Sequence, residues 1–388
     1  MNPLSTPPSV PPLVDEDLAE QAKPGHGIPS QDPDAAAQSP LEPLVAEREA
    51  KSALMGGGVV AGAATGAAIG VAVAGPAGVL VGASLGAVAG ALGAAAAGTT
   101  AGPDTVYLHI DDSGGGGRPL VLIHGWPLSA QAWEPQVSVL QAAGYRVVAY
   151  DRRGFGRSDK PDSSYSYDVL ADDLQRVMEQ CGLQDVTLVG FSMGGGEVAR
   201  YIARHGQSRL RSVVFAAAVA PYLMKTADNP EGPLTPDKAQ EARKALEQDR
   251  EAFFDQFTRT FFSANGVLQV TQAQRSDAIA LCHQSAQAAA LACMDAFGTT
   301  DFRDDLKKIT LPTLVIHGEA DAIVPIEGSG QRTHRAVTHS QLVRVSGAPH
   351  GMNVSHAQAF NDALLTFLRP DPQARSEGAL LRNQRLMP

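Results

Sequence analysis

The clearest reactive group in this chain is a serine in a sharp turn between a strand and a helix. Ser192 lies in the motif Gly-Phe-Ser-Met-Gly at 190–194, directly after the apolar run 186–189 and before a helix-like stretch. Strand, turn and helix in this order form a nucleophile elbow, which exposes the serine hydroxyl at the carboxyl end of the strand. The flanking glycines have no Cβ that would clash in the turn. The alternative is a helix start at which Ser192 only caps backbone amides.

An aspartate and a histidine follow in the order that a nucleophile elbow requires. Asp321 lies in the loop after the buried run 314–316, and His350 lies in the loop after 342–345. Both loops come at the ends of predicted strands, and their presence favours the elbow over the helix cap. Glu319, in the same loop as Asp321, is the alternative acid.

Two further histidines lie at strand ends. His124 and His317 each follow an apolar run and precede a glycine. We interpret both as structural residues that hydrogen-bond to nearby backbone groups.

The proposed chemistry needs a base for the serine and donors for an oxyanion. His350 would take the serine proton and return it to the leaving group, while Asp321 would fix the imidazole tautomer and stabilise the imidazolium. The backbone amide of Met193, next after the serine, is one expected oxyanion donor. The amide of Trp126, in the motif His-Gly-Trp-Pro at 124–127, is the other.

Short buried runs that alternate with helix-like stretches must position these residues. This alternation favours a mostly parallel sheet covered by helices. The glycine-rich segment 113–117 is interpreted as a hairpin turn after the first strand. The expected strands are 106–110, 120–123, 146–150, 186–189, 213–217, 314–316 and 342–345.

One long interruption in this pattern predicts a helical cap. The segment of about 221–310 contains helix-like sequence and no clear strand. Five phenylalanines between 253 and 262 recur at helical spacings, which predicts an apolar core for the cap. They would also contact substrate if the cap covers the pocket.

The two ends of the chain differ from the part between them. Residues 1–51 are rich in proline, alanine and acidic residues without a sustained apolar period. Such a composition buries too little surface to offset the entropy of ordering, so we expect a disordered acidic arm. The polar segment 371–388 is expected to be a disordered tail.

The segment 52–102 has no charged residue and is dominated by glycine and alanine. Glycines recur at every fourth position on both sides of Gly75-Pro76, which places each set on one helical face and predicts a helical hairpin. Each arm is about 20 residues long, enough to cross a bilayer core. The segment resembles glycine-zipper anchors, so membrane association or self-association is the expectation. A low-complexity soluble linker is the alternative.

Charge and cysteine content exclude other classes. A net charge of −10 and the absence of a long basic run argue against a nucleic-acid partner. The three cysteines are too few for a disulfide framework and suit a reducing compartment. The N-terminus lacks the pattern of a secretory signal, so a cytoplasmic protein is expected, with membrane association through 52–102 as an addition.

The motifs after residue 103 resemble the α/β-hydrolases, and more narrowly the cofactor-free bacterial haloperoxidases, aryl esterases and perhydrolases. The resemblance implies an α/β-hydrolase domain over 103–370, with a mostly parallel eight-stranded sheet flanked by helices and the helical cap. The stretches that carry it are 124–129, 150–158, 190–200 and 347–351.

The resemblance implies a serine carboxylesterase or aryl esterase that acts on small carboxylic esters through an acyl-enzyme and needs no metal or cofactor. Some members use hydrogen peroxide as the acyl acceptor, which makes them perhydrolases. In this group a proline just after the oxyanion residue is associated with perhydrolysis, and Pro127 occupies that position. The expected partners are a small acyl ester, hydrogen peroxide and a short carboxylic acid.

Two alternative functions stay open. The first is a cofactor-free chloroperoxidase or bromoperoxidase that oxidises halide through a peracid. The second is a membrane or assembly scaffold that works through 52–102 and carries a vestigial hydrolase domain. Covalent labelling by a fluorophosphonate would exclude the scaffold.

Overall fold

The computed structural model describes residues 106–369. The predicted arm at 1–51, the Gly/Ala-rich hairpin at 52–102 and the tail at 371–388 lie outside the described residues and stay predictions. The described elements are, in chain order, β1 (Ile110–Asp112), β2 (Pro119–Ile123), η2 (Ala130–Trp133), α5 (Glu134–Ala142), β3 (Arg146–Tyr150), α6 (Tyr167–Gln180), β4 (Val186–Phe191), α7 (Met193–His205), β5 (Leu210–Ala216), α8 (Pro236–Gln248), α9 (Arg250–Phe261), β6 (Ser263–Ala264), β7 (Val267–Leu268), α10 (Gln272–His283), α11 (Gln287–Thr299), α12 (Arg303–Leu306), β8 (Thr313–Gly318), η3 (Ile326–Gly328), α13 (Gly330–Ala336), β9 (Gln341–Val345), α14 (Met352–Ser355) and α15 (Ala357–Leu368).

The main sheet has the strand order β1-β3-β2-β4-β5-β8-β9. β1 pairs antiparallel with β3, and every other pairing in this sheet is parallel. The mostly parallel sheet is therefore as predicted. The hairpin assigned to 113–117 is wrong, because this segment joins β1 to β2 and β3 lies between those two strands.

The prediction of eight strands is also wrong for the part that the structure describes, where the main sheet has seven. The segment before β1 does not pair with a strand. Instead, the Tyr107 amide donates to the Asp159 carboxylate and the His109 amide to the Ser158 hydroxyl. These bonds to the loop after β3 use the backbone groups that a longer edge strand would need.

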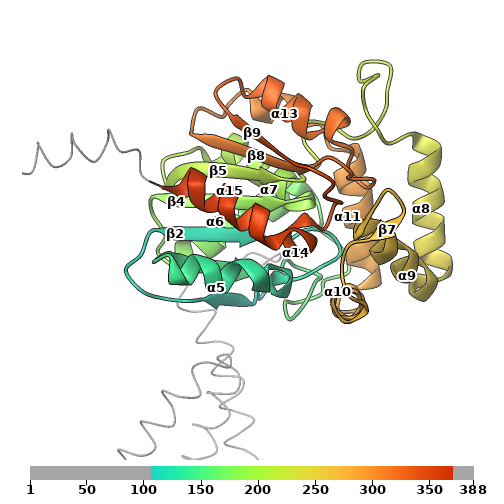
Figure 1. Cartoon of the computed structure of the whole chain (residues 1–388), viewed down its shortest axis with the longest axis horizontal. Coiled ribbons are helices and arrows are strands. Elements are labelled where there is room, and N and C mark those ends of the chain that lie inside the picture. Colours follow the sequence, from blue (N-terminus) through green and yellow to red (C-terminus); the bar gives the residue numbers. More distant parts are fainter. Residues whose placement is uncertain (1–105, 370–388) are drawn as a thin grey trace, which may run out of the picture. The chain divides into compact units, whose positions relative to one another are not determined.

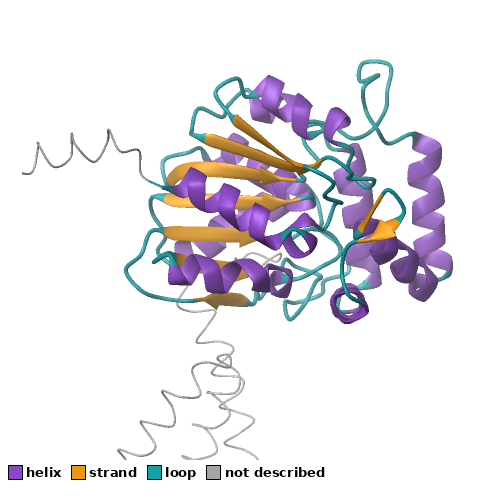
Figure 2. Cartoon of the chain, viewed as in Figure 1, coloured by secondary structure: helices purple, strands orange, loops and turns teal. Residues whose placement is uncertain are grey.

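Helices cover both faces of the sheet. α5 and α15 pack on one face, and α6, α7 and α13 on the other (Figure 1). Figure 2 shows the parallel strands ending toward one side of the molecule, where the helices of the cap lie. Loops at the carboxyl ends of the strands therefore lie between the sheet and the cap, where ligands bind in folds of this kind.

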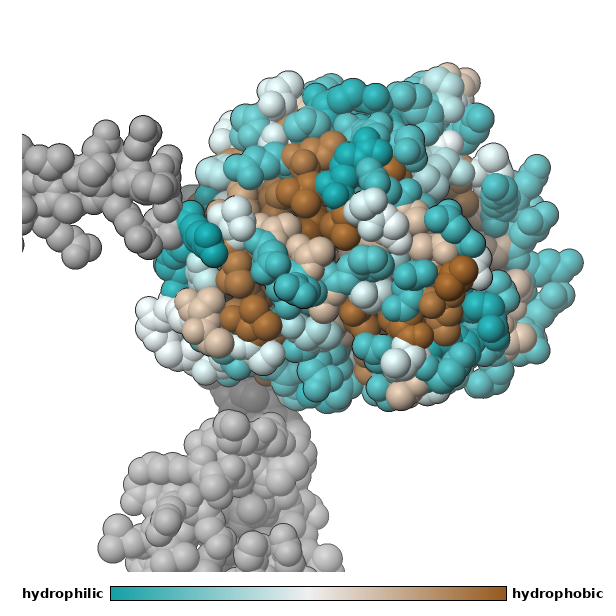
Figure 3. All heavy atoms as spheres, viewed as in Figure 1, coloured by the Kyte–Doolittle hydropathy of each residue, from teal (hydrophilic) through white to brown (hydrophobic). Residues whose placement is uncertain are grey.

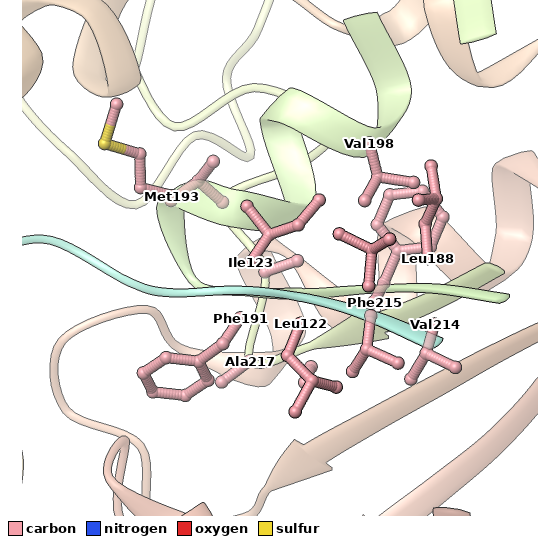
Figure 4. Close-up of a cluster of buried hydrophobic side chains, with 14 of the residues drawn as sticks. Leu122, Ile123, Leu188, Phe191, Met193, Val198, Val214, Phe215 and Ala217 are labelled. Atoms are coloured by element: carbon pink, nitrogen blue, oxygen red, sulfur yellow. The ribbon is translucent and has the colours of Figure 1, made fainter. Parts of the chain in front are cut away.

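The central strands are apolar along their whole length because both of their faces are covered. All six residues of β4 and all six of β8 are buried. Figure 4 shows how successive side chains alternate between the faces: Ile123 and Leu188 lie on the side of Val198 of α7, whereas Leu122 and Phe191 point to the opposite side. This packing holds the strand ends that carry the site.

The cap consists of α8, α9, α10 and α11 and, contrary to the prediction of no strand, the short antiparallel pair β6 and β7. Asn265 and Gly266 join these two strands with φ of 50° and 79°. Two positive φ values are typical of the tight hairpin turn that Asn-Gly favours. The dipeptide Asn265-Gly266 was the sequence signal for this hairpin, and the prediction of no strand overlooked it.

The surface of the described part exposes few large apolar side chains. Tyr107 and Val267 are the two that are more than half exposed. On the face shown in Figure 3, hydrophobic residues form separate patches between hydrophilic ones. Within 106–369, no helix combines the length and the hydropathy that a membrane span needs.

Candidate active site

Ser192 lies between β4 and α7 in a strained turn. Its backbone has φ 54° and ψ −117°, a conformation that side-chain-bearing residues rarely adopt. A Cβ on Gly190 would lie 2.4 Å from the Gly194 carbonyl oxygen, and one on Gly194 would lie 2.5 Å from the Ile123 carbonyl oxygen. Only glycine fits at either position, so the turn that the motif predicts is present. It projects Ser192 from the carboxyl end of β4.

The predicted acid and base meet Ser192. His350 Nε2 lies 2.9 Å from Ser192 Oγ, and His350 Nδ1 lies 2.7 Å from Asp321 Oδ2. All three side chains are nearly or completely buried. The rings of Phe191 and Phe261 pack against the imidazole. The arrangement forms a continuous hydrogen-bonded chain from carboxylate to imidazole to hydroxyl.

The Asp321 carboxylate is saturated with donors. Its Oδ1 accepts the amides of Ile323 and Val324 at 2.9 and 2.8 Å. Burial alone would raise the pKa of this carboxyl, but the charge interaction with His350 and the hydrogen bonds from His317 and His350 outweigh it. The pKa of Asp321 therefore lies well below its ordinary value, and the group stays ionised at neutral pH.

His317 does more than the sequence predicted. Its Nε2 lies 2.8 Å from the Val324 carbonyl oxygen and 3.2 Å from Asp321 Oδ2. The hydrogen bond to the backbone agrees with the predicted structural role, but the contact with Asp321 was not predicted. The available signal was the position of both residues at the end of one strand, four residues apart.

Glu319, the alternative acid, points away from this chain of hydrogen bonds. It forms an ion pair with Arg344 at 2.8 Å, and both side chains are more than a third exposed. Such surface pairs contribute little to stability. The structure therefore brings Asp321, and not Glu319, to the histidine.

The two predicted oxyanion donors belong to segments that adjoin the serine. Met193 is the first residue of α7, and the first amides of a helix have no acceptor within it. Among the described residues, no acceptor receives the Trp126 amide. A Cβ on Gly125 would lie 3.1 Å from the Ser192 Cβ, so the loop after β2 touches the elbow.

Comparison with known proteins identifies this fold. Residues 118–357 match the sequence profile of the α/β hydrolase fold. The chain belongs to the α/β-hydrolase family.

Several α/β-hydrolases share most of the described part. The non-heme chloroperoxidase CPO-A1 of Kitasatospora aureofaciens is 42% identical over 66% of this chain and 93% of its own length. The bifunctional esterase/perhydrolase DCH of Acinetobacter calcoaceticus is 37% identical over 69% of this chain and 97% of its own. The crystal structure of a bromoperoxidase from Bacillus anthracis aligns with a TM-score of 0.67 and 48% identity over 68% and 96% of the two chains.

A partly open cavity of about 760 Å³ lies between the cap of this α/β-hydrolase and the serine. Ser192 and His350 line it, together with Phe253, Phe257 and Phe297 of the cap and Trp126 of the loop after β2. Of the five phenylalanines predicted for the cap core, Phe253 and Phe257 line the cavity while Phe254, Phe261 and Phe262 are buried. Three of the five therefore lie in a buried core, as predicted, while contact of the other two with substrate stays an expectation.

The Trp126 side chain joins the loop after β2 to the cap. Its indole N–H donates to the Ala290 carbonyl of α11 at 2.9 Å. Its ring packs edge-on against Phe253, Phe257 and Phe297. The cap thus constrains Trp126, whose backbone amide is the predicted oxyanion donor.

Other reactive groups lie away from the cavity. Cys282 and Cys293 are free and buried, and burial raises the pKa of each thiol to about 12. Within residues 106–369, no cluster of three or more His, Cys, Asp or Glu side chains is arranged to hold a metal ion.

Proposed function

We propose that this α/β-hydrolase is a serine carboxylesterase that acts through an acyl-enzyme on Ser192. The observation that carries the proposal is the hydrogen-bonded chain of Asp321, His350 and Ser192 on the wall of an apolar cavity. Acid, base and nucleophile in this order are what acyl transfer from an ester requires.

In the acylation step, His350 Nε2 accepts the proton of Ser192 as Oγ attacks the ester carbonyl carbon. The carbonyl oxygen becomes an oxyanion, which accepts hydrogen bonds from the amides of Trp126 and Met193. The imidazolium then gives its proton to the leaving alkoxide, and the acyl-enzyme remains. Water attacks this intermediate with His350 again as base, which releases the carboxylic acid and restores Ser192.

Asp321 supports both steps without taking a proton. Because its pKa is held well below the ordinary value, the carboxylate stays charged while His350 gains and loses its proton. The hydrogen bond at 2.7 Å keeps a proton on Nδ1, so that Nε2 is the nitrogen free to act on the serine.

The cavity suits an ester with an apolar acyl or alcohol group. Its wall includes Trp126, Phe253, Phe257 and Phe297, and its volume of about 760 Å³ accommodates more than an acetyl group. We therefore expect kcat/KM to rise as an apolar substituent is added to a small acetate ester.

A second candidate activity is perhydrolysis followed by halide oxidation. Two relatives favour this activity, because the one from Kitasatospora aureofaciens is named a chloroperoxidase and the one from Acinetobacter calcoaceticus an esterase/perhydrolase. Hydrogen peroxide would replace water as the acceptor, so that the acyl-enzyme and H₂O₂ give a peracid and free Ser192. The peracid then oxidises bromide to hypobromite and is itself reduced to the carboxylic acid.

Ester hydrolysis is tested with p-nitrophenyl acetate and a series of longer and aromatic esters. We expect Ser192→Ala to lower kcat/KM by at least about 10³-fold. Equal rates for the variant and the unchanged protein would refute the proposal.

Perhydrolysis is tested by bromination of monochlorodimedone in acetate buffer with hydrogen peroxide. We expect the reaction to require both acetate and Ser192. Bromination that continues without acetate would contradict the peracid route and leave ester hydrolysis standing.

A further inference from the structure

A cluster of polar side chains is completely buried behind the elbow and has no part in the proposed chemistry. It consists of His124, Tyr150, Arg152 and Glu197, each with no exposed surface. The four residues come from three places: the loop after β2, the end of β3 and the loop after it, and the middle of α7.

Arg152 connects these places through its guanidinium group. Its Nε donates to Glu197 Oε2 at 2.8 Å, and its Nη2 donates to the carbonyl oxygen of His124 at 2.9 Å. The Tyr150 hydroxyl donates to the other carboxylate oxygen of Glu197. One planar fork therefore holds α7 and the loop after β2 at a fixed separation.

Both ends of this bridge lie close along the chain to a proposed oxyanion donor. His124 is two residues before Trp126. Glu197 is four residues after Met193, about one turn further along the same helix. A shift of the bridge would therefore displace one amide relative to the other.

The ring of His124 strengthens the attachment to the oxyanion loop. Its Nε2 accepts the backbone amide of Arg152 at 3.0 Å, so the neutral ring carries its proton on Nδ1 and donates to the Gly125 carbonyl at 2.8 Å. Burial and the charge of Arg152 lower the pKa of His124 to about 3. The ring is neutral at the pH of the reaction, and its tautomer is fixed by these two bonds.

Stability alone does not account for such a cluster. Removing two charges from water costs several kcal/mol per ion, and replacing a buried ion pair by apolar side chains of similar volume is often neutral or stabilising. Apolar residues would fill this space as well. What the pair adds is direction, because each bond has a defined donor, acceptor and angle.

We propose that Arg152 and Glu197 are positioning residues that hold the amides of Trp126 and Met193 in the geometry needed to bind one oxyanion. The proposal rests on the proposed ester hydrolysis. Loss of one oxyanion donor costs about 10²- to 10³-fold in rate, and a small displacement from correct geometry costs up to about 10²-fold. The effect should appear in the transition state and not in substrate binding.

The test replaces Arg152 by lysine, which keeps the charge but lacks the planar guanidinium fork that directs separate N–H groups to Glu197 and to the His124 carbonyl. We expect Arg152→Lys in the full chain to lower kcat for a p-nitrophenyl ester by about 10- to 100-fold, with KM changed by less than about threefold. An alkylboronic acid adds to the serine and places an oxygen between the two amides, so its inhibition constant should rise with the loss of kcat.

Arg153→Lys is the matched control. Arg153 is the next residue, is equally buried and forms an ion pair with Asp173 of α6, at 2.5 Å. We expect it to lower the melting temperature by a similar amount while kcat changes by less than about threefold. Glu197→Gln provides a second test from the other end of the bridge should Arg152→Lys fail to fold, and we expect the same selective loss of kcat.

The outcomes separate this inference from the proposed function. The positioning role would be overturned if a folded variant of Arg152 or Glu197 had the same kcat and the same boronic acid affinity as Arg153→Lys. Ester hydrolysis would stand in that case. A loss confined to KM would also overturn it. Unchanged protein that neither hydrolyses esters nor reacts with a fluorophosphonate would contradict the proposed function and this inference together.

Discussion

The two sides of Ser192 differ in chemistry. On the side of the sheet, the serine is held by buried polar groups with directional hydrogen bonds, as in the Asp321 carboxylate with its backbone and histidine donors. On the side of the cap, aromatic and aliphatic side chains surround a cavity of about 760 Å³. The sheet side can stabilise charge in one geometry, whereas the cap side offers volume and apolar surface.

Because of this difference, residues on the sheet side should control the rate of the reaction, and residues of the cap should control which ester is preferred. Directional bonds on the sheet side leave little freedom for substitution, because a buried polar group without its partner is costly. Apolar contacts in the cap are non-directional, so side-chain volume can change while the fold persists. Substitutions on the sheet side should therefore affect kcat for every ester, and those in the cap should change the ranking of esters.

The largest effect is expected on the sheet side, from Asp321→Asn. The amide keeps the size of the side chain but favours the wrong imidazole tautomer, so kcat should fall by about 10⁴-fold with little change in KM. Steady-state kinetics on short and long esters check this, and the factor should be similar for both. A fall in kcat limited to one class of ester would show that a sheet-side residue also affects which ester is preferred.

A cap substitution should act selectively. A Cβ on Gly298 of α11 would lie 3.2 Å from Leu234, and both residues line the cavity. We expect Gly298→Leu to lower kcat/KM for bulky esters by about 10- to 100-fold relative to p-nitrophenyl acetate. Gly298→Ala, which adds one carbon, should give a smaller shift in the same direction. An equal loss for all esters would show that the cap also controls the reaction.

The buried His124 predicts a pH effect on stability. Its pKa is about 3 in the folded protein, against about 6.5 in an unfolded chain. Below pH 6.5 the unfolded state binds a proton that the folded state does not, so the free energy of unfolding should fall with decreasing pH, by about 1.4 kcal/mol per pH unit at most.

Urea unfolding at several pH values between 7 and 5, on unchanged protein and His124→Asn, isolates this contribution. The variant should have the flatter dependence. Parallel curves for the two proteins would mean that His124 is not held neutral by the fold. The charged groups that face His124 are Arg152 and Asp151.

The smallest effect is expected from Glu319→Gln, in the same loop as Asp321. Glu319 pairs with Arg344 at the surface, so its loss should change kcat/KM by less than about twofold and stability by less than about 1 kcal/mol. The same kinetic and unfolding measurements apply. A loss near that of Asp321→Asn would reverse the assignment of the acid.

Much of this fold and site could be predicted from the sequence because the decisive signals were local. Ser192 lies in a motif typical of a tight strand-to-helix turn, and Asp321 and His350 each lie in the loop after a predicted strand. Parallel strands bring their carboxyl ends together, so these three positions imply contact. The geometry of Ser192, His350 and Asp321 agrees with that prediction.

Two of the missed features, the Arg152–Glu197 pair and the short edge of the sheet, depend on contacts between distant segments. No spacing rule links Arg152 to Glu197, which are 45 residues apart in sequence. The contact of His317 with Asp321 depends on how the loop after β8 folds back. The described sheet has seven strands and not eight. The segment before β1 hydrogen-bonds to the loop after β3 and does not form a further edge strand. Such pairings follow from tertiary packing and not from periodicity.

Covalent labelling of the intact chain tests the central claim most directly. The protein is treated with a fluorophosphonate, digested and analysed by mass spectrometry while ester hydrolysis is followed in parallel. We predict one adduct on the peptide that contains Ser192, loss of hydrolysis in proportion to labelling, and no adduct in Ser192→Ala. Hydrolysis that survives complete labelling, or labelling of Ser192→Ala at the unchanged rate, would contradict the account.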